Sequence, residues 1–370
     1  LGFLRTLSRE WPSVDCLALD IHPAIDNAQA KSLILTELAV ENKSHITLAL
    51  DEQAQRFAMQ FVESEPEAGL VEQSTAKAID KDSVILVSGG AKGVTSACCL
   101  ALASICPCKF VLLGRTELTA LPEWLMGVSA RDNKTLHQAY LSYCQQQGIT
   151  VTPLAIKAEV DKVLNLLEAK ENINKLKQTG AEVLYVALDI NDQAAVMHAL
   201  QSLPSSHQNI TAYVHGAGVL ADQYIHNKTA HDFSQVMMPK IHGLMNIMLA
   251  LEHAKLSHLV LFSSVAAFLG EEGQTVYACA NEILNAYAHS FAAMFPQCVV
   301  RAINWGAWDG GMVDDALKQV LNQHGIGLIP LAQGSALFAQ EFVTDRGKAP
   351  QILITAPGSK ARRPLSTVSI

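Results

Sequence analysis

The sequence predicts an α/β fold organised around a doubly wound parallel β-sheet. From residue 83 onward, apolar runs of strand length alternate with helix-forming stretches, and this order produces parallel strands joined by right-handed helical crossovers. The runs are apolar at almost every position, which is typical of strands covered by helices on both faces. The first run also passes through a glycine-rich turn directly into a helix, as in sheets that bind phosphate groups at their strand ends.

Composition agrees with this fold and excludes several classes of protein. With 370 residues, 49% hydrophobic and 17% charged, the chain suits a globular protein of two or three domains at about 150 residues per domain. The net charge of −8 argues against a general attraction to nucleic acid or to an anionic membrane. No apolar run reaches the roughly 18 residues that span a bilayer, and no targeting segment is visible. We therefore expect a cytoplasmic protein with no nucleic acid and no membrane as partner.

The ends and the cysteines add two further expectations. The chain begins at Leu1 instead of Met, as expected of a segment from a longer chain. The 8 cysteines have no zinc-site spacing, and a helix-to-strand turn explains the pair Cys106 and Cys108 better than a metal site, because a structural zinc needs four ligands. We expect reduced, mostly buried thiols and no metal.

The first 62 residues predict a small, truncated α/β unit. Apolar spacing indicates a helix around residues 3–7, a strand over 14–21 and a helix over 28–40. Residues 63–82 lose this pattern in a stretch with proline, glycine and several acidic residues, which indicates a linker.

The second domain, residues 83–357, accounts for the parallel sheet. Its predicted strands are 84–87, 110–113, 183–188, 210–214, 258–262, 299–303 and 352–355, with a helix over 94–105 after the first strand. Residues 120–180 are too long for an ordinary connection and predict a helical insertion. The final residues, 358–370, are typical of a linker or tail.

The glycine-rich turn after the first strand predicts an anion site. Glycines allow the backbone to approach a pyrophosphate, which then meets the unpaired N–H groups and the positive dipole end of the following helix. The alternative is a tight turn that binds nothing. The candidate residues are Ser88, Gly89, Gly90, Lys92, Gly93 and Val94.

Later strand ends strengthen this prediction and indicate which dinucleotide is bound. Arg115, followed by Thr116, ends the second strand, where an arginine pairs with the 2′-phosphate of NADP and an acidic residue would instead bind the ribose of NAD. A solvated surface arginine is the alternative for Arg115. Because ligands bind at the carboxyl ends of parallel strands, we expect further cofactor contacts at the ends of the third and fourth strands. These candidates are Asp189, Ile190, His215, Gly216, Ala217 and Gly218.

The ordered motifs of the second domain resemble the ketoreductase domains of polyketide and fatty acid synthases, within the short-chain dehydrogenase/reductase superfamily. The matching segments are Ser88–Gly93, Leu113–Arg115, His215–Val219, Met238–Gly243, Leu261–Val265, Gly273–Asn281 and Ile303–Gly306. The resemblance implies a Rossmann-type sheet with an N-terminal truncated Rossmann-like structural subdomain that is catalytically silent. It also implies NADPH as cofactor, a 3-oxoacyl thioester on the phosphopantetheine arm of an acyl carrier protein as substrate, and neighbouring synthase domains as partners. The long insertion resembles that of polyunsaturated fatty acid synthases.

Ketone reduction needs an acid beside the carbonyl oxygen and a cation that makes the acid effective. Tyr277 is the candidate proton donor, and a nearby ammonium would lower its pKa from about 10 toward the working range. Ser264, at a strand end, would orient the carbonyl. Lys240 would bind the nicotinamide ribose and tune Tyr277. Taken singly, a core tyrosine, a turn serine and a solvated lysine are the more ordinary interpretations.

Three positions depart from wider patterns. Most members of the superfamily carry a lysine four residues after the tyrosine, whereas Asn281 stands here; synthase ketoreductases look like this, and one helical turn keeps Asn281 on the catalytic face. Thr95 replaces a usual glycine, which predicts a helix shifted slightly off the sheet. Lys92 replaces a common glycine, and either contacts a phosphate or remains in solvent.

A short segment after the fourth strand predicts the stereochemistry. Leu220-Ala221-Asp222 resembles the Leu-Asp-Asp signature of ketoreductases that form (3R)-hydroxyacyl products, and no tryptophan precedes Tyr277 where the opposite class carries one. Leu220 and Asp222 are therefore the candidate stereocontrol residues. Two other functions remain open: a non-catalytic dinucleotide-binding scaffold, and a free-standing dehydrogenase of alcohols.

Overall fold

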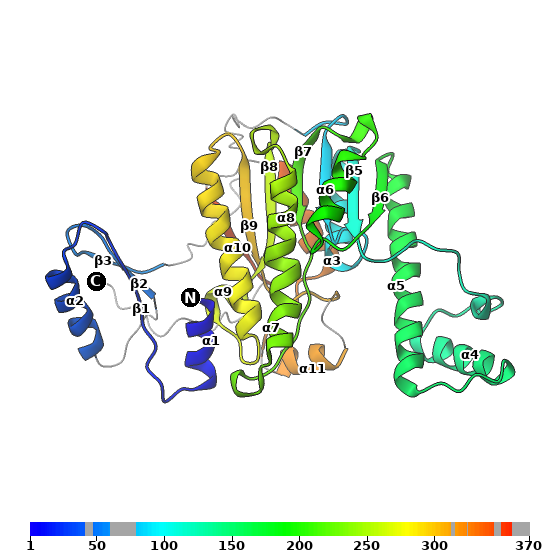
Figure 1. Ribbon diagram of the computed structural model, residues 1–370, viewed down its shortest axis with the longest axis horizontal. Helices are drawn as coiled ribbons and strands as arrows, with labels where there is room; N and C mark the ends of the chain where they lie inside the picture. Colours follow the sequence, from blue (N-terminus) through cyan, green and yellow to red (C-terminus); the bar gives the residue numbers. More distant parts are fainter. Residues whose placement is uncertain (41–46, 60–78, 312–314, 324, 344–348, 357–370) are drawn as a thin grey trace.

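The computed structural model describes residues 1–40, 47–59, 79–311, 315–323, 325–343 and 349–356 (Figure 1). At its centre lies a seven-stranded sheet with the order β10-β9-β8-β7-β4-β5-β6, in which every neighbouring pair is parallel. The strands are β4 (Val84–Ser88), β5 (Lys109–Gly114), β6 (Glu182–Ala187), β7 (Ile210–His215), β8 (His258–Ser264), β9 (Val299–Trp305) and β10 (Gln351–Ile354). The predicted doubly wound α/β fold and its strands are confirmed.

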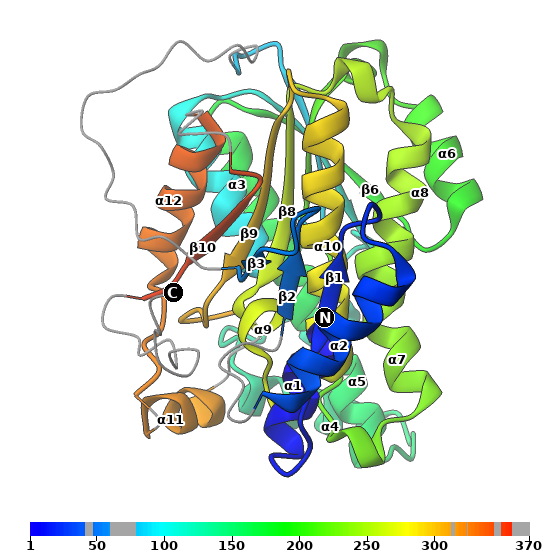
Figure 2. The same cartoon turned by 90° about the vertical axis from the view of Figure 1, so that its left-hand side faces the viewer.

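Side-chain alternation along the strands builds two cores, one on each face of the sheet. In β4, Ile85 and Val87 enter one core, whereas Val84 and Leu86 enter the other. Figure 2 shows the helices that cover these faces. They are α3 (Gly93–Ile105) and α12 (Leu331–Val343) on the first, and α6 (Gln193–Gln201), α8 (Gly243–Ala250) and α10 (Thr275–Met294) on the second. Because helices cover both faces of the sheet, the strands do not need a polar, solvent-exposed side and can be apolar at successive positions. The continuous apolar runs in the sequence predicted this arrangement.

The strand order reverses at β4, and this reversal places the site. The chain leaves β4 toward β5 and β6, and later returns to β7 on the other side of β4. A ligand crevice forms at such a switch point, outside the carboxyl ends of the strands. The segments that follow β7 and β8 reach this edge: η3 (Ile225–Asn227), α7 (Ala230–Met237), η4 (Met238–His242) and α9 (Val265–Leu269).

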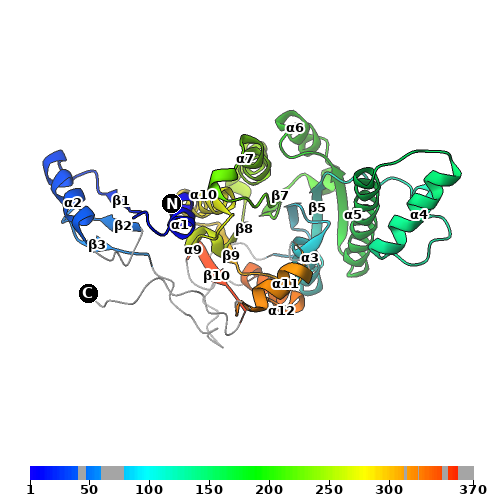
Figure 3. The ribbon, with the colours of Figure 1, turned by 90° about the horizontal axis from the view of Figure 1, so that it is seen from below.

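Between β5 and β6 the chain forms the predicted helices, α4 (Asn133–Gln146) and α5 (Pro153–Gln178), with the short turn η1 (Glu123–Leu125) before them. Helix α5 belongs to two cores. Its first half packs with α4 around Val160 and Leu136, whereas its second half brings Ile173 and Leu176 into the core beneath α3. The second half thus serves as the ordinary crossover helix, and α4 projects beyond the sheet (Figure 3).

The N-terminal residues divide between two places. A three-stranded sheet joins β1 (Ala18–Ile21), β2 (Thr47–Leu50) and β3 (Arg56–Phe57), with α2 (Asn27–Ala39) beside it. The strand predicted over 14–21 therefore begins later, at Ala18, and sequence reasoning did not find β2 and β3. Helix α1 (Gly2–Glu10) lies apart from this sheet, against α9 and α10 (Figure 1).

Specific contacts fix α1 to the second domain. A Cβ on Gly2 would meet the backbone carbonyl carbon of Ala278 at 2.5 Å, so only glycine allows this approach. Arg5 donates to the Ala267 carbonyl oxygen at 2.6 Å and pairs with Glu282 at 3.2 Å. Helix α1 is thus packed against the second domain.

Some expectations concern residues that are not described, or features that the described part lacks. Most of the predicted linker, residues 63–82, and the predicted tail, 358–370, lie outside the described residues. Within the described ranges, no helix combines the length and apolarity needed to cross a membrane, and no cluster of three or more His, Cys, Asp or Glu side chains is placed to hold a metal. The 8 cysteines are free thiols and mostly buried.

The remaining helical elements are η2 (Ser205–His207), η5 (His253–Lys255) and α11 (Asp315–Gln323).

Candidate active site

A cavity of about 2330 Å³ runs along the carboxyl ends of the strands. Most of the predicted site residues line it. These are Gly89, Lys92, Gly93, Val94, Arg115, Thr116, Asp189, Ile190, Gly216, Ala217, Gly218, Leu220, Asp222, Lys240, Ser264 and Tyr277. Ser88, Gly90, His215 and Asn281 are the predicted residues that do not line it. The fold therefore brings the glycine-rich turn at residues 88–94, called the phosphate turn below, and the candidate catalytic residues to one continuous space.

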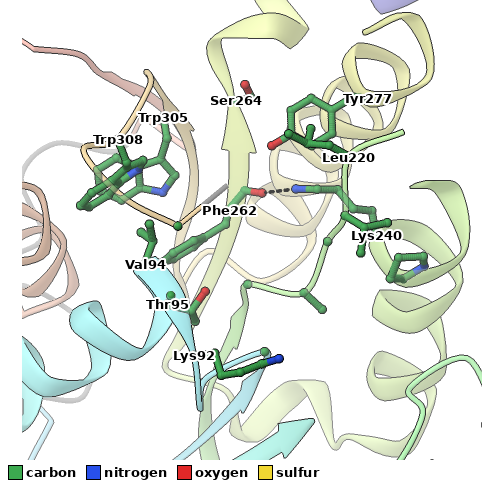
Figure 4. Close-up of a pocket in the computed structure, with 18 of the residues that line it drawn as sticks. Lys92, Val94, Thr95, Leu220, Lys240, Phe262, Ser264, Tyr277, Trp305 and Trp308 are labelled. Atoms are coloured by element: carbon green, nitrogen blue, oxygen red, sulfur yellow. Dashed lines mark hydrogen bonds between the residues drawn. The ribbon is translucent and has the colours of Figure 1, made fainter. Parts of the chain in front are cut away.

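Lys240 stands on a π-helical turn, η4, which contains Pro239 and interrupts the path from α7 to α8. Its side chain is only 4% exposed. The Nζ atom donates to the Phe262 carbonyl oxygen at 2.7 Å and to Asn281 Oδ1 at 2.8 Å, and lies 5.2 Å from the centroid of the Tyr277 ring (Figure 4). Burial lowers the pKa of Lys240 to about 7, so the ammonium can lose its proton near neutral pH. The two acceptors hold the ammonium in position.

Asn281 acts through Lys240. Its side chain is completely buried, its Oδ1 accepts from Lys240, and its Nδ2 donates to the Tyr277 carbonyl oxygen at 2.9 Å. Ser263 Oγ donates to the Asn281 carbonyl oxygen at 3.1 Å. Because Asn281 does not reach the cavity, we assign it as a positioning residue for Lys240 instead of a group that touches substrate.

Tyr277 and Ser264 face the cavity from α10 and the end of β8. Burial raises the pKa of Tyr277, and side-chain hydrogen bonding to Asn281 and Ser264 acts in the opposite direction. The expected lowering of this pKa by Lys240 is therefore not found in the protein alone, because desolvation of the phenol is the largest influence on it and raises it. Tyr277 is thus held protonated at neutral pH, as a proton donor must be. The Ser264 Oγ atom accepts from the Ala266 N–H at 3.2 Å, which leaves its own proton available to donate.

His215 is a buried support for Lys240. It is completely buried; Tyr213 OH lies 2.7 Å and Ser88 Oγ 2.9 Å from its Nδ1, and its Nε2 lies 3.0 Å from the Lys240 carbonyl oxygen. With Nε2 donating to that carbonyl, Nδ1 is the acceptor, and the imidazole is neutral. Burial and the nearby Lys240 lower the pKa of His215 to about 3. The side chains of Ser88 and His215 bond to each other, and His215 also bonds to the Lys240 carbonyl. A cofactor contact of either residue, as predicted, would therefore have to come from its backbone.

We expect the buried neutral His215 to make stability depend on pH. Its pKa is about 3 when folded and 6.5 as the reference value, so the unfolded chain binds a proton that the folded chain does not. The free energy of unfolding should therefore fall as the pH drops below 6.5. His215→Asn should flatten this dependence in urea titrations, whereas His226→Asn, at an exposed position, should retain it; equal slopes in all three proteins would contradict the assignment.

The phosphate turn has the geometry of an anion site. Gly89 and Gly93 have φ angles of 74° and 57°, which favour glycine, and a Cβ on Gly89 would meet the Ala217 backbone nitrogen at 3.2 Å. The Gly93 N–H donates to Glu168 Oε1 at 2.8 Å, so a carboxylate from α5 already occupies the amide at the start of α3. Gly90 is required for packing instead, since a Cβ there would meet Val87 Cγ1 at 2.7 Å.

Helix α5 also fixes Lys92, which sequence reasoning could not anticipate. Lys92 Nζ donates to Asn165 Oδ1 at 2.5 Å, and Asn172 Nδ2 donates to the Ala91 carbonyl oxygen at 3.1 Å. Burial lowers the pKa of Lys92, opposed by Glu168 and assisted by Arg115. Lys92 and Arg115 both line the cavity, and the charge of Arg115 acts on Lys92. The only sequence signal for these partners is polar residues at helical spacing in α5.

The Thr95 side chain fits into space left by the missing side chain of Gly216. A Cβ on Gly216 would collide with Thr95 Oγ1, so the absent side chain at 216 provides the room that Thr95 needs. The two positions complement each other, and Thr95 is buried beside Gly216, the residue that follows β7.

This geometry fits a nicotinamide dinucleotide. The Gly93 N–H donates to the carboxylate of Glu168, so this amide can bond to an anionic group. The cations Lys92 and Arg115 line the same cavity, and the glycines at 89, 216 and 218 add no side chains to it. A doubly wound sheet with this turn at its switch point, and Tyr, Lys and Ser gathered beside it, defines a Rossmann-type oxidoreductase that uses a nicotinamide dinucleotide. The profile described as KR domain matches residues 83–310. The chain therefore belongs to the ketoreductase (KR) domain family.

Relatives of the chain are parts of large synthases. A polyunsaturated fatty acid synthase polypeptide of Thraustochytrium sp. is 31% identical over 349 residues, covering 92% of this chain and 12% of that polypeptide. Polyketide synthase PksN of Bacillus subtilis is 31% identical over 169 residues, covering 44% of this chain and 3% of that protein. The chain thus spans a small part of the length of each relative.

Two solved structures share the fold. An N-terminal ketoreductase from the macrolactin assembly line has a TM-score of 0.68 at 21% identity, covering 99% of this chain and 61% of that chain. A ketoreductase domain from the bacillaene assembly line has a TM-score of 0.67 at 23% identity, covering 96% and 72%.

Proposed function

We propose that this protein reduces a 3-oxoacyl thioester, carried on an acyl carrier protein, to the (3R)-hydroxyacyl thioester with NADPH. The observation that carries this proposal is the set of Tyr277, Ser264 and a buried Lys240 on the same cavity as the phosphate turn. Its synthase relatives support a role as one domain of a cytoplasmic multidomain polyunsaturated fatty acid or polyketide synthase, with neighbouring domains as partners.

The chain's own residues account for binding and proton transfer. The turn at Gly89 and Gly93, with Lys92 and Arg115, would hold NADPH, which supplies the hydride when bound. Ser264 donates a hydrogen bond to the ketone oxygen and orients the carbonyl toward the cofactor end of the cavity. Tyr277 then gives its phenolic proton to that oxygen as negative charge develops. The Lys240 ammonium, held by Phe262 and Asn281, stabilises the phenolate that remains.

Arg115 should determine the preference for NADPH over NADH. A charged hydrogen bond to a 2′-phosphate contributes about 1.5–3 kcal/mol, so Arg115→Leu should weaken NADPH binding by about tenfold to a hundredfold. NADH binding should change little, because NADH lacks that phosphate. Fluorescence titration of both cofactors measures this, with Arg131→Leu at an exposed position as control. Equal losses for both cofactors would show that Arg115 does not recognise the phosphate.

The stereochemical proposal rests on Leu220 and Asp222. Both line the cavity beside Tyr277, and Phe268 and Leu269 form the wall where the opposite class carries a tryptophan. Gln274 Nε2 donates to Asp222 Oδ2 at 3.0 Å, which holds this segment against the start of α10. We propose that this wall directs the carbonyl face that gives the (3R) product.

One assay tests the activity and its stereochemistry together. Purified protein is mixed with NADPH and a β-ketoacyl pantetheine thioester, oxidation is followed by absorbance, and the product is resolved by chiral chromatography. Turnover to (3R)-hydroxyacyl product supports the proposal, and predominantly (3S) product would overturn its stereochemical part. NADPH binding without turnover would favour a non-catalytic scaffold, and equal turnover of unattached alcohols would favour a general dehydrogenase.

A further inference from the structure

The loop that carries Leu220 and Asp222 is tied to the loop before Tyr277 by two charged side chains that lie outside the cavity. These are Glu10, from α1, and Lys228, from the segment after η3. Both are partly buried, and neither lines the cavity. They meet at Gly273, whose backbone both of them contact.

Glu10 accepts hydrogen bonds from two separate loops. The Ile225 N–H donates to Oε2 at 2.7 Å, and the Gly273 N–H donates to Oε1 at 2.9 Å. Thr275 Oγ1, in the first turn of α10, lies within 3.5 Å of the same Oε1. Hydrogen bonds to a charged carboxylate are stronger than neutral ones, so each loop gains a firm anchor on α1.

Lys228 completes the connection from the opposite side. Its Nζ donates to the Ala221 and Gly273 carbonyl oxygens, both at 2.9 Å. The Gln223 N–H also donates to the Gly273 carbonyl oxygen, at 3.0 Å. Gly273 has a φ of 77°, a conformation that favours glycine and that turns its N–H toward Glu10 and its carbonyl toward Lys228.

We infer that Glu10 and Lys228 are positioning residues that set the distance between the stereocontrol segment 220–222 and Tyr277. The segment at 221 and the loop at 273 are far apart in the chain, and Glu10 and Lys228 add charged contacts to the direct hydrogen bonds that Gln223 and Gln274 make between them. Loss of either charge loosens one wall of the cavity relative to the other. An N-terminal helix that the sequence assigns to a silent subdomain thereby determines how precisely the thioester is placed.

This inference rests on the proposed function, and its test separates the two. Glu10→Gln retains the shape of the side chain but replaces one acceptor oxygen by an NH₂ group. Lys228→Met removes the two hydrogen bonds that Nζ donates to the Ala221 and Gly273 carbonyl oxygens. In each variant we expect KM for the thioester to rise by about tenfold, with a larger (3S) fraction, because small misplacements of a reacting group carry large costs. The NADPH dissociation constant should stay within about twofold, since the phosphate turn lies elsewhere. The double variant should add little to the single variants, because both break one connection.

The matched control is Glu171→Gln with Lys175→Met, a comparable ion pair of 2.7 Å on the exposed face of α5. If Glu10→Gln and Lys228→Met lower only the melting temperature, with KM and product ratio unchanged, the inference is wrong and the residues are merely structural. Wild-type protein without turnover would instead overturn the proposed function. In that case amide hydrogen exchange decides: segments 221–225 and 270–275 should exchange faster in both variants, and unchanged exchange would overturn the connection itself.

Discussion

Tyr277→Phe is expected to lower kcat by about 10²–10⁴-fold, because it removes the general acid while leaving the ring in place. The phenol is the candidate acid that lines the cavity beside Ser264, and burial raises its pKa, so it is protonated at neutral pH. NADPH affinity should be unchanged, since the hydroxyl is not required to hold the phosphates. Stopped-flow oxidation of NADPH, together with cofactor titration, measures both quantities.

The control for this prediction is Tyr143→Phe, on α4. That variant should retain full activity. Turnover by Tyr277→Phe at a rate near that of the wild type would show that another group protonates the substrate and would remove the central residue of the proposed mechanism.

Lys240→Met should reduce kcat/KM by at least about 10²-fold, because it deletes the cation beside the developing phenolate and leaves buried acceptors unsatisfied. The acceptors are the Phe262 carbonyl oxygen and Asn281 Oδ1. Since the pKa of Lys240 is lowered to about 7, the ammonium predominates below that pH and is lost above it. The kcat/KM for NADPH in the wild-type protein should therefore fall as the pH rises through about 7.

The pH profile gives this second prediction an independent check. Asn281→Ala removes one of the two acceptors of Lys240 and should lower activity less than Lys240→Met does. Lys175→Met, at an exposed position of α5, should leave the profile intact. A flat profile between about pH 6 and 9 would contradict a neutral-range titration of Lys240.

Local sequence signals were sufficient for the seven-stranded sheet and for the glycine-rich turn that follows its first strand. The run at 84–87 is apolar at every position, and the run at 258–262 is apolar at every position except His258. Such runs have few stable arrangements other than strands covered on both faces. Glycines at 89 and 93 have backbone requirements that depend on the turn alone, so their positions were readable without a partner.

The roles of residues that depend on contacts with distant parts of the chain were harder to predict from the sequence. His215 looked like a cofactor contact because it ends a strand, yet its ring is enclosed and bonds to the backbone of Lys240. The predicted lowering of the Tyr277 pKa was wrong for a similar reason, because a local pattern does not show the burial that raises this pKa. The contacts of Lys92 come from α5, whose register against the turn no local pattern encodes.

The sequence by itself determined the strands of the seven-stranded sheet and the glycine-rich turn after its first strand, because each follows from periodicity or from residue type at a strand end. The candidates Tyr277, Ser264 and Lys240 came from ordered motifs that resemble those of ketoreductases. Only the tertiary structure decided which groups hold these residues in place. Helix α1 joins the catalytic half through Arg5 and Glu10, and α5 reaches the phosphate turn through Glu168. Such contacts join residues far apart in the chain, and they depend on how buried surfaces pack, which is a property of the whole fold and not of any local segment.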